Sequence, residues 1–196
     1  GFVGEALGFE EGLRGEPFVG SAGGVLSRLL HGASIDRSHV RIANVVSCRP
    51  PEDHLAGASY EFAAIQQCRQ YLQPVLDRVP DNGMVVPLGG TALQSILNLH
   101  GVAGASVKNF HGTVQRDPTN RFWVSPTFHP SFLQRGAMGH FEVVRQDIIR
   151  AEKISREGFK RAPTNLIVDP PLDWCRAWWA WAVAKIAADP DGIWTA

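Results

Sequence analysis

Apolar and polar positions along the chain predict short strands interleaved with helices. Compact apolar runs occupy residues 2–3, 39–46 and 84–88, and each is followed by a loop rich in glycine or proline. Two further short strands are expected at residues 112–115 and 122–125. Strands that alternate with helices pair in parallel and carry the helices on their faces. The pattern therefore predicts an α/β fold with a mostly parallel sheet.

Apolar residues at helical spacing predict the helices between these strands. Ser21 is expected to cap the first helix, and Thr91 with Gln94 is expected to form a capping box at another. A last amphipathic helix is expected over about 141–156. The inner faces of the two longer internal helices are defined by Val25, Leu26, Leu29, Leu30, Ile65, Cys68, Leu72 and Leu76.

The pattern changes after residue 157, where proline-containing segments are typical of a linker. A tail helix follows, with Trp174, Trp178 and Trp181 on one face. The last residues of the chain, 193–196, resemble the start of a strand. We therefore divide the chain into a domain over 1–157, a linker over 158–171, and a tail over 172–196 that begins a further domain. The run at 2–3 is shorter than an ordinary strand of about five residues. The sequence is thus expected to begin inside a strand of a longer protein.

Composition restricts the class of protein. Of 196 residues, 44% are apolar and only 19% are charged, which excludes a disordered chain. Nineteen basic residues balance nineteen acidic ones, which excludes a strongly basic coat for nucleic acid but permits a local basic lining. No apolar stretch is long enough for a membrane span. We expect a soluble protein, without membrane contact, in the cytoplasm of a bacterial or phage-infected cell.

Candidate chemistry gathers in loops that follow the predicted strands, where parallel sheets place their ligands. The glycine-rich loop from Gly4 to Gly24 holds Glu5 and Glu11, and it fits either carboxylate chemistry or an ordinary glycine turn. No lysine follows its glycines, which excludes a P-loop. Asn44 lies in an apolar strand, and its amide needs a partner in the loop backbone or on a base edge. His129 follows a strand and precedes a proline, and alone it fits a structural role as well as a functional one.

The combination of five stretches resembles the uracil-DNA glycosylase superfamily. It is most similar to the iron–sulfur-containing bacterial and archaeal branch often called family 4. The stretches occur in the family's order and cover about residues 2–157. The resemblance implies a three-layer α/β/α sandwich around a central, mostly parallel sheet. The matching stretches are GEALGFEEGLRGEPFVGSAG, NVVSCRPP, CRQYL, PLGGTAL and FHPSFLQR.

The resemblance implies base excision repair, in which the enzyme flips deoxyuridine out of DNA and hydrolyses its N-glycosidic bond. Ala6, Phe18 and Asn44 match the residues that hold the base. Phe18 would stack on uracil, and the Asn44 amide would pair with the uracil edge and reject cytosine. His129 matches the residue that donates a hydrogen bond to uracil O2 and thereby stabilises the departing anion.

The resemblance also assigns carboxylates and DNA contacts. Glu5 and Glu11 match loop carboxylates of this branch, and one of them would orient the attacking water or stabilise the oxocarbenium-like sugar. Glu11 is the preferred of the two. The residues after the HPS motif would enter the duplex as an apolar wedge. The side chains implied to contact DNA are Ser21, Ser131, Phe132, Leu133 and Arg135.

Three cysteines are too few for a disulfide framework and are expected to be intracellular thiols or metal ligands. Cys48 and Cys68 match the last two of four ligands that hold a [4Fe–4S] cluster in this branch. As isolated residues they also fit ordinary core cysteines. The cluster is implied for the intact protein, with the sulfurs of both residues directed to a common site near the amino end. Cys175 lies outside the matching region.

Two departures from the family pattern support an alternative function. Leu7 stands where the family usually has proline, and Asp53-His54 replaces the usual Asn-Arg and adds negative charge to a DNA-facing loop. The alternative is a non-catalytic uracil- or DNA-binding module fused to a replication protein, such as a phage DNA polymerase with its exonuclease domain. Residues 191–196 resemble the run into such an exonuclease. A nucleotide-binding metabolic enzyme would leave the HPS and CRPP motifs unexplained.

Overall fold

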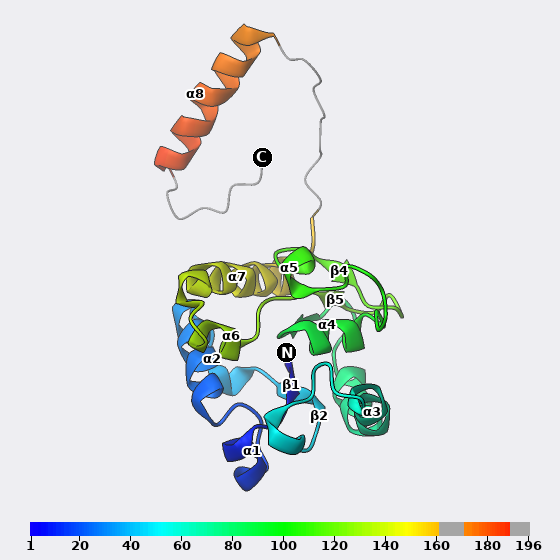
Figure 1. The fold of residues 1–196 in the computed structure, drawn as a ribbon. Helices are drawn as coiled ribbons and strands as arrows, with labels where there is room; N and C mark the ends of the chain where they lie inside the picture. Colours follow the sequence, from blue (N-terminus) through cyan, green and yellow to red (C-terminus); the bar gives the residue numbers. More distant parts are fainter. Residues whose placement is uncertain (161–170, 189–196) are drawn as a thin grey trace. The chain divides into compact units, whose positions relative to one another are not determined.

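The computed structural model describes residues 1–160 and 171–188. The chain separates into two compact units, Gly1–Lys160 and Arg161–Ala196. The first unit is an α/β domain (Figure 1). The described part of the second unit is a single helix, α8 (Leu172–Ala188), which contains the predicted tail helix with its tryptophans. The predictions for residues 161–170 and 189–196 lie outside the described residues.

The sheet of the first unit has five strands in the order β2-β1-β3-β5-β4. The pairs β1·β2, β1·β3 and β3·β5 are parallel, and only the edge pair β4·β5 is antiparallel. The predicted mostly parallel sheet is therefore confirmed. The strands are β1 (Phe2–Ala6), β2 (Ile42–Val46), β3 (Met84–Pro87), β4 (Gln115–Arg116) and β5 (Trp123–Val124).

Neighbouring residues on a strand point to opposite faces of the sheet, and this divides the core in two. Phe2 and Val86 belong to one apolar cluster, whereas Val3 and Val85 belong to the other. Helices cover both faces, which confirms the three-layer α/β/α sandwich (Figure 1). The first cluster is closed by α2 (Ser21–Gly32), α6 (Pro130–Gln134) and α7 (Phe141–Glu157), and the second by α3 (Glu61–Asp77) and α4 (Gly90–Ile96).

The connections hold short helical segments that periodicity did not predict. The loop expected from Gly4 to Gly24 is instead the end of β1 followed by α1 and the start of α2. The strand expected from residue 39 begins only at Ile42, because the residues before it form a 3₁₀ turn. The short segments are α1 (Phe9–Arg14), η1 (Arg37–His39), η2 (Pro51–Asp53), α5 (Val107–Phe110) and η3 (Met138–His140).

Both predicted helix caps are wrong. The N-cap of α2 is Gly20, one residue before Ser21, and it makes no side-chain hydrogen bond. The N-cap of α4 is Gly89, and the Thr91 hydroxyl is directed to carboxylates instead of the helix backbone. In both cases a glycine permits the chain to enter the helix close to other side chains, and at α4 this leaves the Thr91 hydroxyl for a different contact. No helix in the described part of the chain is long and apolar enough to cross a membrane.

The α2 side of the core predicts a clear stability effect. Leu26 is fully buried in the first cluster, so Leu26→Ala is expected to lower the free energy of unfolding by about 3 kcal/mol through lost burial and a cavity. Leu13→Ala is the matched control, because Leu13 is 74% exposed and should change stability by less than about 0.5 kcal/mol. Urea denaturation of both variants measures the difference, and equal effects would contradict the assigned core.

Candidate functional site

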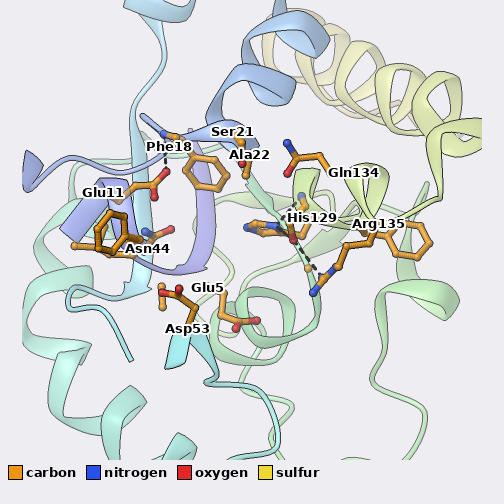
Figure 2. A pocket seen from close by; sticks show the side chains of 18 of the residues that line it. Glu5, Glu11, Phe18, Ser21, Ala22, Asn44, Asp53, His129, Gln134 and Arg135 are labelled. Atoms are coloured by element: carbon orange, nitrogen blue, oxygen red, sulfur yellow. Dashed lines mark hydrogen bonds between the residues drawn. The ribbon is translucent and has the colours of Figure 1, made fainter. Parts of the chain in front are cut away.

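A cavity of about 600 Å³ opens at the carboxyl edge of the sheet. Its lining comes from the end of β1, from β2, from the turn after β3 and from the start of α6, which is the edge where parallel strands place their ligand sites. Figure 2 shows the side chains that converge on it. The predicted site residues in its lining are Glu5, Ala6, Glu11, Phe18, Ser21, Asn44, His129, Ser131, Phe132 and Arg135.

The backbone of Phe18 is fixed in an unusual conformation. Its φ is 56°, in the left-handed region that a bulky residue adopts only when its surroundings hold it there. Arg37 Nη2 donates a 2.7 Å hydrogen bond to the Phe18 carbonyl. Gly23 of α2 packs against the same carbonyl, so closely that a Cβ at this position would lie 1.8 Å from the oxygen. These contacts hold the buried Phe18 ring at the cavity wall.

Gly4 allows the Phe18 ring and the Asn44 amide to approach the same strand. Gly4 pairs with Asn44 in the parallel register of β1 and β2. A Cβ on Gly4 would lie 2.5 Å from Asn44 Oδ1 and 2.6 Å from the Phe18 ring, both closer than van der Waals contact permits. A side chain at this position would therefore displace the ring, the amide or both.

The Asn44 amide oxygen is buried without a partner. The residue is 7% exposed, and its Oδ1 accepts no hydrogen bond from the described residues. A buried acceptor left unpaired costs on the order of 1–3 kcal/mol, and a bound ligand with an N–H group would remove that cost. The alternative partner considered for Asn44, the loop backbone, does not supply this bond. The amide oxygen is thus available to a ligand in the cavity.

The contacts of His129 set its tautomer. Nδ1 accepts a hydrogen bond from the Ser131 backbone N–H and lies 2.8 Å from Ser131 Oγ, which in turn accepts a 3.2 Å hydrogen bond from Arg135 Nη2. Because Nδ1 acts as an acceptor here, we assign the ring proton to Nε2. The ring centroid lies 5.5 Å from that of Phe18. His129 therefore brings an N–H donor next to the aromatic wall.

His129 is neutral at physiological pH. Its pKa is lowered from 6.5 to about 4, mainly by burial and also by the positive charge of Arg135, while the negative charge of Glu11 acts in the opposite direction. Burial disfavours the charged ring because a low-dielectric site solvates it poorly. The neutral ring keeps Nδ1 as an acceptor and Nε2 as a donor.

The two carboxylates predicted to be catalytic are held by different elements. Glu11 of α1 accepts a 2.8 Å hydrogen bond from the Gly20 backbone N–H on Oε1, and its carboxylate packs between Gly8 and Gly20. Glu5, which lies on β1 and not in a loop, accepts a 3.0 Å hydrogen bond from Thr91 Oγ1 on Oε2. Glu11 thereby links α1 to the start of α2, while Glu5 is tied to α4.

The negative charge expected from Asp53 is paired. Arg49 donates two hydrogen bonds to its carboxylate, of 2.6 and 2.8 Å. The guanidinium also lies 4.9 Å from the centre of the Phe9 ring. The Arg49 hydrogen bond lowers the pKa of Asp53, so the pair stays ionised. The expectation of a free negative charge in this loop is corrected: Asp53 lines the cavity as one half of an ion pair.

Leu133 does not belong to the surface. It is 0% exposed and packs in the first core cluster, which contradicts the predicted contact with DNA. The short helix α6 turns Leu133 toward the core and leaves Phe132 at the cavity. The Phe132 ring stacks on Phe128 with centroids 5.1 Å apart. Phe128 and Gln134 also line the cavity and were missed as site residues, although both stand inside the FHPSFLQR stretch.

Comparison with known proteins places the chain in a family. The model of a family described as the uracil DNA glycosylase superfamily matches residues 2–151. The chain belongs to this superfamily. The resemblance predicted from the five stretches is therefore confirmed.

The relatives carry the name of one branch of the superfamily. A type-4 uracil-DNA glycosylase of Thermotoga maritima is 36% identical over 165 residues, which cover 80% of this chain and 78% of the relative. That of Archaeoglobus fulgidus is 37% identical over 113 residues, 58% of this chain and 54% of the relative. That of Sulfurisphaera tokodaii is 33% identical over 133 residues, 66% of this chain and 58% of the relative. The chain thus spans little more than half of the latter two.

The two cysteines of this chain that the resemblance implies as cluster ligands lie close together. The Cys48 thiol is close enough to that of Cys68 to be affected by it: burial, and after it the neighbouring Cys68 thiol, raises the pKa of Cys48. Cys48 is exposed and Cys68 is buried on α3. Cys48 follows Val46, the partner of Ala6, so the pair lies at the carboxyl edge of the sheet and not beside Gly1 as expected. Within the described ranges no three His, Cys, Asp or Glu side chains form a metal-binding group.

The buried histidine predicts a specific pH response. Because the folded-state pKa of His129 is about 4 and its unfolded value is 6.5, the unfolded chain binds more protons between these values. The stability contribution of the neutral ring is thus fully present above pH 6.5 and is lost as the pH falls toward 4. NMR titration of the ring should give a midpoint near pH 4, and a midpoint near 6.5 would contradict the assigned burial. His129→Gln should unfold with a smaller loss of stability on acidification over this range.

Proposed function

We propose that this protein removes uracil from DNA by hydrolysing the N-glycosidic bond of a flipped-out deoxyuridine. The observation that carries the proposal is the unpaired, buried Asn44 amide oxygen, which shares one cavity with the Phe18 ring and a neutral His129. The names of the type-4 relatives support the same activity. Residues 1–157 form the catalytic domain in this proposal, and a fused polymerase remains a prediction.

Asn44 recognises the base through its amide oxygen. Uracil carries an N–H at N3, which would donate to Oδ1 and satisfy the unpaired acceptor. Cytosine has no proton at N3, so its binding would leave this oxygen unpaired in a buried site. A site built to hydrogen-bond one group rejects an analogue that lacks it far more strongly than an apolar pocket does. Phe18 supplies the stacking surface, and Gly4 keeps space for both side chains.

His129 stabilises the leaving base. As the glycosidic bond breaks, negative charge develops on the uracil ring and its O2. The Nε2–H group donates to that oxygen, and the donation strengthens as the charge grows. A neutral donor fits this role, because Ser131 fixes the position of the ring before the reaction. The ring can then stabilise the leaving base by a hydrogen bond, without transfer of a proton.

A carboxylate orients the attacking water and stabilises the positive charge on the sugar. The sequence favours Glu11 for this role, whereas the contacts of the two residues favour Glu5. Glu11 is confined between two glycines and already holds the Gly20 N–H, which suits a residue that fixes the loop before α2. Glu5 is bonded through Oε2, and its Oε1 has no hydrogen bond to the described residues. We therefore propose that Glu5 orients the attacking water.

The DNA backbone binds along the rim of the cavity. The first turn of α2 has backbone N–H groups without helical partners, and Ser21 stands there in the cavity lining. Ser131 and Arg135 add a hydroxyl and a cation on the other side, and Phe132 takes the role of the apolar wedge. These local contacts permit a chain of zero net charge to bind DNA.

A [4Fe–4S] cluster in the intact protein would use Cys48 and Cys68 as two of its four thiolate ligands. The adjacent thiols fit such a group, because a cluster needs several sulfurs within a few ångströms of one another. Bound there, the cluster would tie the loop after β2 to α3 and so stiffen one rim of the cavity. Two further ligands would have to come from residues beyond these two.

The activity itself is the first test of the function. The full-length protein is expected to convert a uracil-containing oligonucleotide into one with an alkali-labile abasic site, and to leave thymine and cytosine controls whole. His129→Ala should lower the single-turnover rate on the order of a hundredfold, because it removes a donor aimed at developing charge. Its affinity for uracil DNA should fall far less, because Phe18 and the phosphate contacts remain.

A matched histidine separates this effect from general damage. His39→Ala should keep the wild-type rate, because the His39 side chain is 82% exposed on the 3₁₀ turn η1. A wild-type protein that binds uracil DNA tightly and releases no base would contradict the glycosylase and support the non-catalytic binding module. Equal rates for wild type and His129→Ala would contradict the assigned donor.

The cluster is tested by iron content. The full-length protein purified without oxygen should be brown and contain about four irons per chain. Cys48→Ala and Cys68→Ala should each lower the iron content and bleach the visible absorbance. Cys175→Ala is the control and should retain both, because this residue lies in the second unit. A colourless, iron-free wild type would show that Cys48 and Cys68 do not hold a cluster.

A further inference from the structure

Thr91 lies where two acidic side chains meet. It is 4% exposed in the first turn of α4, and its hydroxyl oxygen lies 3.0 Å from Glu5 Oε2 and 3.4 Å from Glu61 Oε1. The three residues come from β1, α3 and α4 and are far apart in sequence. The sequence pattern placed this hydroxyl in a helix cap, and the cap is made by Gly89 instead. The hydroxyl is therefore free to serve the carboxylates.

The hydroxyl has one proton, and the contacts show which carboxylate receives it. Glu61 accepts a 2.7 Å hydrogen bond from the Gly57 backbone N–H on its other oxygen, and its distance to Thr91 is the longer one. Glu5 has no other hydrogen-bond donor among the described residues. The Thr91 hydroxyl therefore donates its hydrogen bond to Glu5, the closer of the two carboxylates.

The position of Thr91 is itself well fixed. Gly89 adopts φ = +94°, a conformation that favours glycine, and its N–H donates to the Thr127 carbonyl. Its own carbonyl accepts the first helical hydrogen bond, from Leu93. These bonds anchor the start of α4 to the sheet edge that also leads to His129. The hydroxyl is thus held by the same frame as the proposed leaving-group donor.

We propose that Thr91 is a positioning residue for catalysis: its hydroxyl holds Glu5 Oε2 so that Oε1 is directed at the attacking water. This inference rests on the proposed function and extends it to a residue that does not line the cavity. Glu5 on a free strand end would sample several rotamers, and only some of them would reach the water. A hydrogen bond from a buried hydroxyl selects one of them before substrate binds. Misplacement of a reacting group by about 1 Å costs on the order of a hundredfold in rate.

The variants are chosen to separate positioning from packing. Thr91→Val keeps the shape of the side chain and removes the hydroxyl, and Thr91→Ser keeps the hydroxyl and removes the methyl. Ser95→Ala is the matched control, because Ser95 lies one turn later on α4, is 5% exposed and has a hydroxyl without a hydrogen-bond partner. Thermal unfolding is recorded for each. Thr91→Ala replaces Thr91→Val if the latter does not fold.

The rates should separate in a defined way. Thr91→Val should lower kcat about ten- to a hundredfold and leave KM within about twofold, because the base and phosphate contacts are unchanged. Thr91→Ser should restore most of the loss, and Ser95→Ala should match the wild type. In a Glu5→Gln background, Thr91→Val should have no further effect, because the two residues then act through one group. Additive losses or a wild-type kcat in Thr91→Val would overturn the proposal.

A crystal structure separates failure of this inference from failure of the proposed function. In Thr91→Val the Glu5 carboxylate should leave the position it holds in the wild type, whether or not uracil is the substrate. An unmoved Glu5 would overturn the positioning role alone. A wild-type protein without excision activity, combined with a displaced Glu5, would overturn the catalytic meaning of the contact together with the proposed function.

Discussion

The site depends on one close approach, that of Gly4 to the Phe18 ring and the Asn44 amide. The parallel register places Gly4 opposite Asn44, and the absence of a Cβ lets the ring and the amide touch the strand together. Gly23 repeats this principle behind Phe18, where a Cβ would overlap the carbonyl that Arg37 holds. Gly4 in the paired strand and Gly23 in the packed helix thus allow the close contacts that give the cavity wall a fixed shape. The remaining site residues are arranged around that wall.

Burial determines the chemistry of the polar groups at this wall. It keeps His129 neutral, and it makes the unpaired Asn44 oxygen costly until a donor arrives. The unpaired oxygen lowers the stability of the empty protein, and a ligand that donates to it removes this cost. Groups held in place before the reaction stabilise developing charge without reorganisation. The fold therefore provides a donor and an acceptor whose positions and ionisation states are set by packing.

The local pattern of apolar residues was sufficient to predict the layers of the fold and the edge of the sheet where the site lies. Apolar spacing located the long helices and the parallel strands, and their carboxyl ends hold the cavity as expected. Contacts between distant segments could not be predicted in this way. Thr91 is a good cap by sequence, yet its hydroxyl donates a hydrogen bond to Glu5, which lies 86 residues before it. Leu133 stands in the stretch for which the resemblance implied contact with DNA, but the turn of α6 directs it into the core.

Three of the four acidic residues in the cavity lining, Glu5, Glu11 and Asp53, show how a neutral chain can combine acid chemistry with DNA binding. Each is bonded to a donor: Glu5 to Thr91 of α4, Glu11 to the Gly20 N–H before α2, and Asp53 to Arg49 of the same loop. The Arg49 pair offsets the charge of Asp53 at the rim, where phosphates would be repelled. Glu5 and Glu11 are instead bonded to neutral donors. Negative charge is thereby concentrated where a positive sugar would form, and reduced where the DNA backbone would lie.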